Sequence, residues 1–146
     1  MNSRFDEISA IRALLLTVLA AALCLVSFGA GPPTELPKDL LSQWSRFQAA
    51  LRTDDVKLLA EVTHFPLESN EFGGNIKSGD VLATRYKTIF PEKTKKCLLA
   101  STLKREESEG DVYYDVYCDV GAYPIRFIFS KVGSRYYFTG IDNINE

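Results

Sequence analysis

Hydrophobic and polar residues alternate along most of the second half of the chain, and alternation of this kind predicts β-strands. Short polar or glycine-containing segments interrupt the alternation, and Gly133-Ser134 has the two residues of a tight hairpin loop. The pattern therefore predicts four antiparallel strands that follow one another as a meander. Their expected ranges are 97–104, 111–120, 125–132 and 135–142.

The apolar residues also determine the expected register, because a slip of one residue would move them to the opposite face of the sheet. In the first hairpin, the register that groups them sets Cys97 opposite Cys118 and Lys104 opposite Asp111. The other expected facing pairs are Val116 with Phe129, Cys118 with Phe127, Asp119 with Arg126, Phe129 with Phe138, and Phe127 with Gly140. One face of the sheet then collects the large apolar side chains and forms the core.

Cys97 and Cys118 face each other in this register. Facing residues on antiparallel strands are separated by a distance that a disulfide can span. We therefore expect a disulfide between them, and a ring of this size stabilises a fold by about 3 kcal/mol in the loop-entropy description. Two buried free thiols are the alternative, and the export signal described below favours the disulfide.

The opposite face of the predicted meander carries aromatic side chains among charged ones. Large aromatic patches on a solvent-facing sheet often mark contact surfaces. We therefore expect an interface there, formed with a second copy of the chain or with another secreted protein. Its expected residues are Leu98, Tyr113, Tyr117, Ile128 and Tyr137. Asp115 lies on the same face, where we expect solvent around it, so it is a poor acid–base candidate.

The first half of the domain has the residue spacing of amphipathic helices. The expected helices cover 38–52, 55–63 and 79–90, two short strands cover 64–69 and 72–77, and a charged connector covers 92–96. The sequence thus predicts an α+β fold, in which N-terminal helices pack on one face of a curved antiparallel sheet with a C-terminal four-stranded meander.

An apolar stretch near the N-terminus has the features of a secretory signal. Residues 12–28 begin with an arginine, and small residues then occupy the positions that precede a cleavage site, which we expect near Gly29/Ala30. The stretch is short for a membrane span, which needs about 20 apolar residues. Two acidic residues close to the start make it less basic than usual, so an uncleaved N-terminal anchor is an alternative.

Three segments follow from these patterns: a signal peptide over 1–29, a proline- and glycine-rich linker over 30–37, and one α+β domain over 38–146. The third cysteine, Cys24, lies within the signal and leaves an even number for the secreted domain. The chain of 146 residues has a formal net charge of −2, without the basic excess that nucleic-acid binding requires. We expect no nucleic acid, and no membrane contact after cleavage.

Motifs that carry chemistry are sparse. His64 is the single histidine, so with two cysteines paired no set of metal ligands can be assembled. No dinucleotide fingerprint, P-loop or serine–histidine–aspartate spacing occurs in the sequence. We expect no metal and no cofactor. A capping or surface role explains His64 more simply than a catalytic pairing with Glu61 or Glu68.

The most polar row on the helix-facing side of the predicted sheet is a candidate pocket. Tyr114, Lys131 and Tyr136 belong to this row, and Trp44, the single tryptophan, adds a wall on which a ligand can stack. The alternative is a polar rim at the place where the sheet extends beyond the helices, with Trp44 as a core anchor. No catalytic residue is assigned.

The order of the predicted elements resembles that of the NTF2-like (cystatin-like) superfamily. The stretch FQAALRTDDVKLLAEVTHFPLES is similar to the opening of small secreted bacterial members, in which a second helix runs into Phe-Pro-Leu or a close variant. The resemblance covers most of the domain. It implies a cone-shaped fold, a pocket between sheet and helices, and dimerisation through the sheet, but no single function, because the fold hosts enzymes and non-enzymes.

Three function classes are compatible with these observations. We expect a secreted, periplasmic binding or interaction domain without catalytic activity, because the outer face is aromatic and no catalytic set is present. An isomerase- or cyclase-type enzyme is one alternative, and it requires a buried acid with a shifted pKa beside a deep cavity. A periplasmic inhibitor or immunity protein is the other, which the small, disulfide-bonded format allows.

Overall fold

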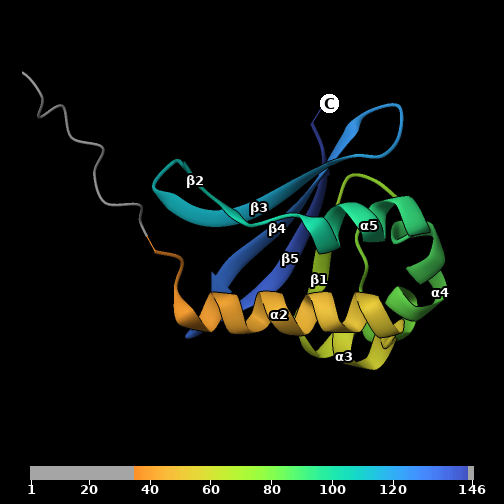
Figure 1. Cartoon of the computed structure of the whole chain (residues 1–146), viewed down its shortest axis with the longest axis horizontal. Coiled ribbons are helices and arrows are strands. Elements are labelled where there is room, and N and C mark those ends of the chain that lie inside the picture. The colour runs from red at the N-terminus through yellow and green to blue at the C-terminus, as the bar shows by residue number, and fades with distance from the viewer. Residues whose placement is uncertain (1–34, 145–146) are drawn as a thin grey trace, which may run out of the picture. The chain divides into compact units, whose positions relative to one another are not determined.

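The computed structural model describes residues 35–144, which form helices packed on one face of a five-stranded sheet. Figure 1 shows the helices together on one side of the strands. The α+β class predicted from the sequence is confirmed. The predicted signal peptide and cleavage site lie outside the described residues.

Four helices are present, at Lys38–Thr53 (α2), Val56–Glu61 (α3), Gly79–Ile89 (α4) and Glu92–Ala100 (α5) among the described residues. Helix α4 begins at Gly79 as the sequence predicts, and α3 begins at Val56, one residue later than expected. The side chains of Asp55 and Ser78 cap these two helices, because they accept hydrogen bonds from the free amides of the first turn. Helix α5 was not predicted.

The sheet contains strands Thr63–Ser69 (β1), Lys104–Ser108 (β2), Asp111–Asp119 (β3), Pro124–Val132 (β4) and Arg135–Asn143 (β5). Their order is β1-β5-β4-β3-β2. Strand β1 runs parallel to β5, and the other pairs are antiparallel, so the sheet is mixed and not fully antiparallel as expected. The second short strand, expected over 72–77, is reduced to a single bridge between Leu67 and Ile76.

The strand predicted over 97–104 is wrong, because the first half of this segment belongs to helix α5. Pro91 follows the end of α4 and stands at the N-cap of α5. The lysine, leucine and alanine residues of α5 favour a helix, and Thr94 and Leu98 lie one turn apart on its buried side. Leu98 therefore belongs to the core and not to the expected interface on the outer sheet face.

The first hairpin is correspondingly shorter than predicted. Lys104 pairs with Asp115 instead of Asp111, and Ser108 pairs with Asp111. The two intervening residues, Glu109 and Gly110, have positive φ values of 54° and 90°. Positive φ at both central residues is the requirement of a two-residue loop that matches the twist of the strands, and this loop sets the register.

The register of the other strands differs from the prediction in two places. Between β3 and β4 the partners are displaced by two residues, so Val116 pairs with Phe127. A displacement of two preserves the face of every side chain, and the predicted apolar face remains the buried one. Between β4 and β5 the predicted Phe129–Phe138 pair is present, but a bulge after Ile128 sets Phe127 opposite Ile141.

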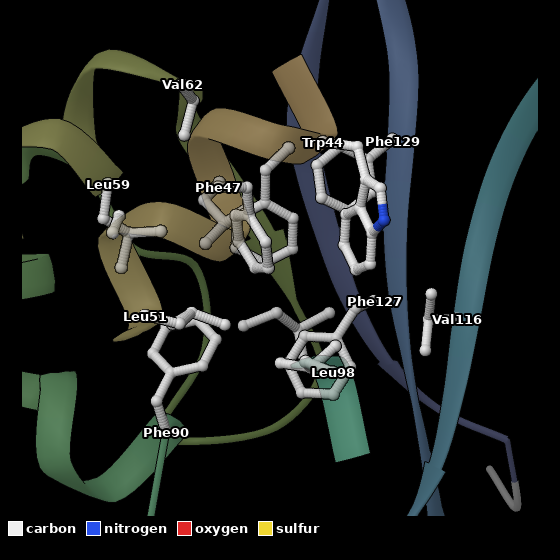
Figure 2. Close-up of a cluster of buried hydrophobic side chains, with 14 of the residues drawn as sticks. Trp44, Phe47, Leu51, Leu59, Val62, Phe90, Leu98, Val116, Phe127 and Phe129 are labelled. Atoms are coloured by element: carbon white, nitrogen blue, oxygen red, sulfur yellow. The ribbon is translucent and has the colours of Figure 1, made fainter. Parts of the chain in front are cut away.

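Aromatic rings fill the space between α2 and the sheet. Phe47 is fully buried, and its ring centroid lies 5.1 Å from that of Phe129 and 5.1 Å from that of Phe138. Figure 2 shows Phe47 and Trp44 reaching from α2 toward the rings of β4, with Leu98 approaching from α5. The core is thus a single aromatic cluster between helices and sheet.

The predicted disulfide between Cys97 and Cys118 is present, with a Cα–Cα distance of 5.9 Å. It joins helix α5 to strand β3. The sequence pattern predicted that it would join two facing strands. The bond therefore fastens a helix onto the sheet. Within residues 35–144, no helix has the length and apolar character needed to cross a membrane.

Candidate functional site on the outer sheet face

The four residues of the predicted pocket lie on the helix-facing side of the sheet or at its edge. Trp44, Tyr114 and Tyr136 are buried, and the rings of the two tyrosines meet edge to face at 5.7 Å. Trp44 packs edge to face on Phe129 at 5.3 Å. Lys131 is exposed, and its Nζ lies 5.8 Å from the centre of the Tyr136 ring. These aromatic side chains contact one another.

A hollow of about 740 Å³ lies on the opposite, outer face of the sheet. Residues from all five strands line it, with Ser108 as the contribution of β2. The lining side chains used below are His64, Glu68, Asp111, Tyr113, Arg126, Ile128, Ser130, Lys131, Val132 and Thr139. A second hollow of about 450 Å³ shares Glu68, Arg126, Ile128 and Gly140 with the first, so the two form one depression across the sheet, called the outer hollow below.

Gly140 is part of the floor of the outer hollow. Gly140 pairs with Ile128 across β4 and β5, and a Cβ added to the glycine would lie 3.3 Å from Cδ1 of Ile128. The missing side chain therefore lets Ile128 pack against bare backbone. The sequence prediction placed Phe127 over this glycine, and the bulge between Ile128 and Phe129 explains why Ile128 occupies the position instead.

The expected interface residues other than Leu98 surround the outer hollow. Tyr113 and Ile128 line it, and the Tyr137 ring lies 6.1 Å from that of His64, which also lines it. Tyr117 is on the same face of β3 and is 39% exposed. The structure thus brings these residues to one face, around a depression that the sequence pattern did not reveal.

Arg126 is the main cation of the outer hollow. It forms an ion pair with Asp142, whose Oδ1 also accepts a hydrogen bond of 2.6 Å from the Asn70 side chain. The guanidinium carbon lies 5.7 Å from the centre of the Tyr113 ring, within the range of a cation–π contact. Its Nε is buried and has no hydrogen-bond partner.

Asp115 is the residue that sequence reasoning missed. Its position on the outer face is as predicted, but its exposed fraction is 0% and neither carboxylate oxygen has a hydrogen-bond partner. Burial raises the pKa of Asp115 and repulsion from Glu106 adds to this, while the Tyr117 hydroxyl and the charges of Arg126 and Lys104 oppose the shift. The available signal was the sequence YYDVY, which places a tyrosine on each side of the acid on the same face.

Replacing Asp115 by asparagine is expected to remove part of the pH dependence of stability. A raised carboxyl pKa means that the folded protein holds the proton longer than the unfolded chain. The stabilisation is therefore complete below the ordinary pKa of 3.8 and is lost as pH rises through the folded-state value. Thermal unfolding across a pH series measures this, with Glu107→Gln as an exposed control. Identical profiles for the wild type and Asp115→Asn would contradict the expectation.

A second polar cluster lies at the turn between α2 and α3. Asp54 has a φ of 53°, and its carboxylate accepts hydrogen bonds of 2.7 Å from the Tyr86 hydroxyl and 2.9 Å from Lys95 Nζ. The hydrogen bond from Tyr86 and then that from Lys95 lower the pKa of Asp54, while burial raises the pKa of Tyr86. Since each group has its partner, this cluster ties the turn to α4 and α5.

Glu61, one of the two acids considered for His64, forms an ion pair of 2.6 Å with Arg46 instead. Glu68 and His64 both line the outer hollow. Among residues 35–144, no group of three or more histidine, cysteine, aspartate or glutamate side chains is placed to hold a metal ion.

No protein-family model matches the chain, and no curated protein sequence matches it. Similar solved structures include a protein of unknown function with a cystatin-like fold from Nostoc punctiforme, at 13% identity and a TM-score of 0.48, covering 75% of this chain and 93% of that one. An NTF2-like protein with a cystatin-like fold from Novosphingobium aromaticivorans is 16% identical, with a TM-score of 0.41 and 88% of each chain covered.

An NTF2-like protein of unknown function from Shewanella oneidensis is also 16% identical, with a TM-score of 0.38, covering 71% of this chain and 94% of that one. Identities and TM-scores of this size carry no assignment of activity or ligand. The chain resembles NTF2-like proteins with a cystatin-like fold, and the likeness is one of fold alone.

Proposed function

We propose that the chain is a secreted binding domain that holds another secreted protein in the outer hollow. The observation that carries the proposal is the depression of about 740 Å³ on the sheet face turned away from the helices. Concave surfaces with apolar walls and a few polar groups are the usual form of binding sites. Ile128 and Val132 provide apolar wall, and the Ser130 and Thr139 hydroxyls bond each other at 2.7 Å.

The interior of the fold supports an outer site. Phe47 lies within ring-contact distance of Trp44, Phe90, Phe129 and Phe138, at 5.5, 6.1, 5.1 and 5.1 Å between centroids. These rings occupy the space between the sheet and the helices, which is where the resemblance to NTF2-like proteins implies a pocket. A partner that binds from outside meets a preformed depression and leaves this packing intact.

The charges around the outer hollow indicate the chemistry of the partner. Glu68, Asp111 and Asp142 contribute three negative charges, and Arg126 and Lys131 contribute two positive charges. Because these charges nearly cancel and Arg126 is already paired with Asp142, the hollow has no strong preference for an anion or a cation. We therefore propose an uncharged, partly apolar segment of the partner protein as the occupant.

Secretion is the second part of the proposal. It is supported by the apolar stretch over 12–28 in the sequence and by the disulfide between Cys97 and Cys118, since disulfides persist in oxidising compartments. The proposed mature chain begins near Ala30. The intact mass of the protein purified from an extracytoplasmic fraction tests this directly, because removal of the signal and formation of the disulfide both change the mass.

An isomerase- or cyclase-type enzyme is the alternative that one observation favours. Asp115 is a buried acid with a raised pKa, which is the group such an enzyme requires. Its carboxylate is, however, closed off from solvent and does not line the outer hollow. A general acid must come within hydrogen-bonding distance of its substrate, so the binding domain is the better supported function.

Site-specific crosslinking in the native host tests the proposal. A photoreactive phenylalanine at position 113 is expected to capture one other secreted protein, because Tyr113 lines the outer hollow. The same residue at position 41 is the control, since Leu41 is 42% exposed but belongs to helix α2. Adding Ile128→Glu is expected to abolish the adduct from position 113, because it introduces a charge at the floor.

Three outcomes would overturn the proposal. Equal capture from positions 113 and 41 would mean that contact at the hollow is not selective. An adduct of twice the mass of the chain would identify a second copy as the occupant. Absence of any adduct from position 113, in a protein shown to be folded by its thermal unfolding curve, would mean that the outer hollow holds no protein.

A further inference from the structure

The carboxylate oxygens of Asp115 on β3 and Nε of Arg126 on β4 are buried without a hydrogen-bond partner on the outer sheet face. The Tyr117 hydroxyl interacts electrostatically with both side chains. Asp115 pairs with Ile128 and Arg126 pairs with Tyr117, so the two are diagonal neighbours on the same face. Diagonal neighbours are within reach of long side chains.

The arrangement suits an uncharged Asp115. Burial of a carboxylate without a hydrogen bond is costly, and protonation removes most of that cost. In agreement with this geometry, burial raises the pKa of Asp115. Arg126, meanwhile, is bound to Asp142 on the other neighbouring strand, β5. The Arg126 guanidinium therefore has Asp142 as its present partner and a second acid, Asp115, on its other side.

We propose that ionisation of Asp115 draws the Arg126 guanidinium from Asp142 toward Asp115, and that this movement reshapes the outer hollow. The exchange is balanced, because one proton leaves Asp115 and one ion pair replaces another. Asp142 keeps the hydrogen bond from Asn70 at 2.6 Å and so retains a partner after the exchange. Arg126 moves away from Glu68 and Gly140, which lie beside it in the lining.

Other charged groups face Asp115 from each neighbouring strand. Lys104 and Glu106 lie on β2, where Lys104 pairs directly with Asp115. Tyr113 and Tyr117 lie on β3, and Arg126 on β4 with Asp142 behind it on β5. Burial favours the neutral acid most strongly and repulsion from Glu106 adds to it, while the Tyr117 hydroxyl, Arg126 and Lys104 favour the charged form.

Lys104 is the competing cation. It pairs with Asp115 across the strands, but its side chain is exposed to water and forms no ion pair with the acid. The Arg126 guanidinium already has a buried N–H without an acceptor, so a new bond there satisfies two buried groups together. Because two buried groups gain a hydrogen bond together, Arg126 is favoured over Lys104 as the partner of ionised Asp115.

The inference rests on the proposed function only in its last step, the effect on binding. The exchange itself is measurable on the isolated protein by NMR, from mildly acidic to mildly alkaline pH. The ¹³C signal of the Asp115 carboxyl is expected to titrate above its ordinary range. The ¹⁵N–¹H signal of Arg126 Nε is expected to shift with the same midpoint.

Variants distinguish Arg126 from Lys104 as the partner of ionised Asp115. In Asp115→Asn the Arg126 signal is expected to lose its pH-dependent shift, and in Asp142→Asn it is expected to move toward its high-pH position at a lower pH. Lys104→Gln is the matched control: the Asp115 and Arg126 signals are expected to keep one common midpoint, displaced upward because Lys104 lowers the pKa of Asp115. An Arg126 signal that does not follow Asp115 in the wild type, or a midpoint that disappears in Lys104→Gln, would overturn the inference.

Repeating the crosslinking at position 113 on both sides of the midpoint connects the exchange to binding. A change of at least several-fold in adduct yield is expected across the midpoint, and Asp115→Asn is expected to show none. A correct NMR result with unchanged crosslinking would refute the control of binding and leave the exchange standing. A failed NMR result with strong crosslinking would refute the exchange and leave the binding domain standing.

Discussion

Replacing Phe47 by alanine is expected to lower the free energy of unfolding by about 4 kcal/mol. The Phe47 side chain is fully buried at the centre of the aromatic cluster, where it contacts rings from α2, from the segment after α4 and from the sheet. Alanine removes the ring and leaves a cavity that rigid aromatic neighbours fill poorly. Urea unfolding followed by circular dichroism measures the change.

The control for this variant lies on the same helix. Leu41→Ala removes an apolar side chain that is 42% exposed, so a loss below about 0.5 kcal/mol is expected. The dependence of stability on urea concentration is expected to remain the same in both variants, because the fold is retained. A loss below about 1.5 kcal/mol for Phe47→Ala would contradict the central position of this ring.

Replacing Cys97 and Cys118 together by serine is expected to lower the free energy of unfolding by about 3 kcal/mol. The bond spans a sequence separation of 21 residues, and its loss frees the unfolded chain. It also releases α5 from β3, although Gln48 of α2 still donates a hydrogen bond of 3.0 Å to the Leu98 carbonyl. Unfolding in urea with and without a reducing agent measures the contribution.

The reducing agent supplies the internal control. The wild type is expected to lose stability on reduction until it matches the double serine variant, and the variant is expected not to respond. An oxidised wild type no more stable than the variant would show that the bond adds nothing beyond the packing of α5. Loss of stability in the variant on reduction would point to an effect unrelated to this pair.

The sequence predicted the parts of the fold that depend on local spacing. The stripe that contains Trp44 and Phe47 has the period of a helix, and the cap at Ser78 marks the start of another. The prediction of a strand around Cys97 was wrong because a short apolar stretch has no periodicity that distinguishes a strand from a helix. Pro91 was the missed signal, since proline both ends one helix and begins the next.

The candidate site was harder to predict than the fold. The alternation correctly placed Tyr113, Asp115 and Tyr117 on one face of β3. Alternation tells which face a side chain is on, but the exposure of that face depends on the twist of the sheet and on the neighbours across it. The burial of Asp115 and the outer hollow both depend on this twist and on these neighbours. The bulge beside Ile128 interrupts the alternation of side chains, so a pattern with a period of two residues does not predict it.

Strand β2 has a further consequence for the behaviour of the protein at high concentration. It is at one edge of the sheet, as Figure 1 shows, and is only five residues long. Four of its residues, Lys104, Arg105, Glu106 and Glu107, are charged. A short charged edge strand discourages another chain from continuing the sheet. Crowding should therefore not drive this domain into fibres through its β2 edge.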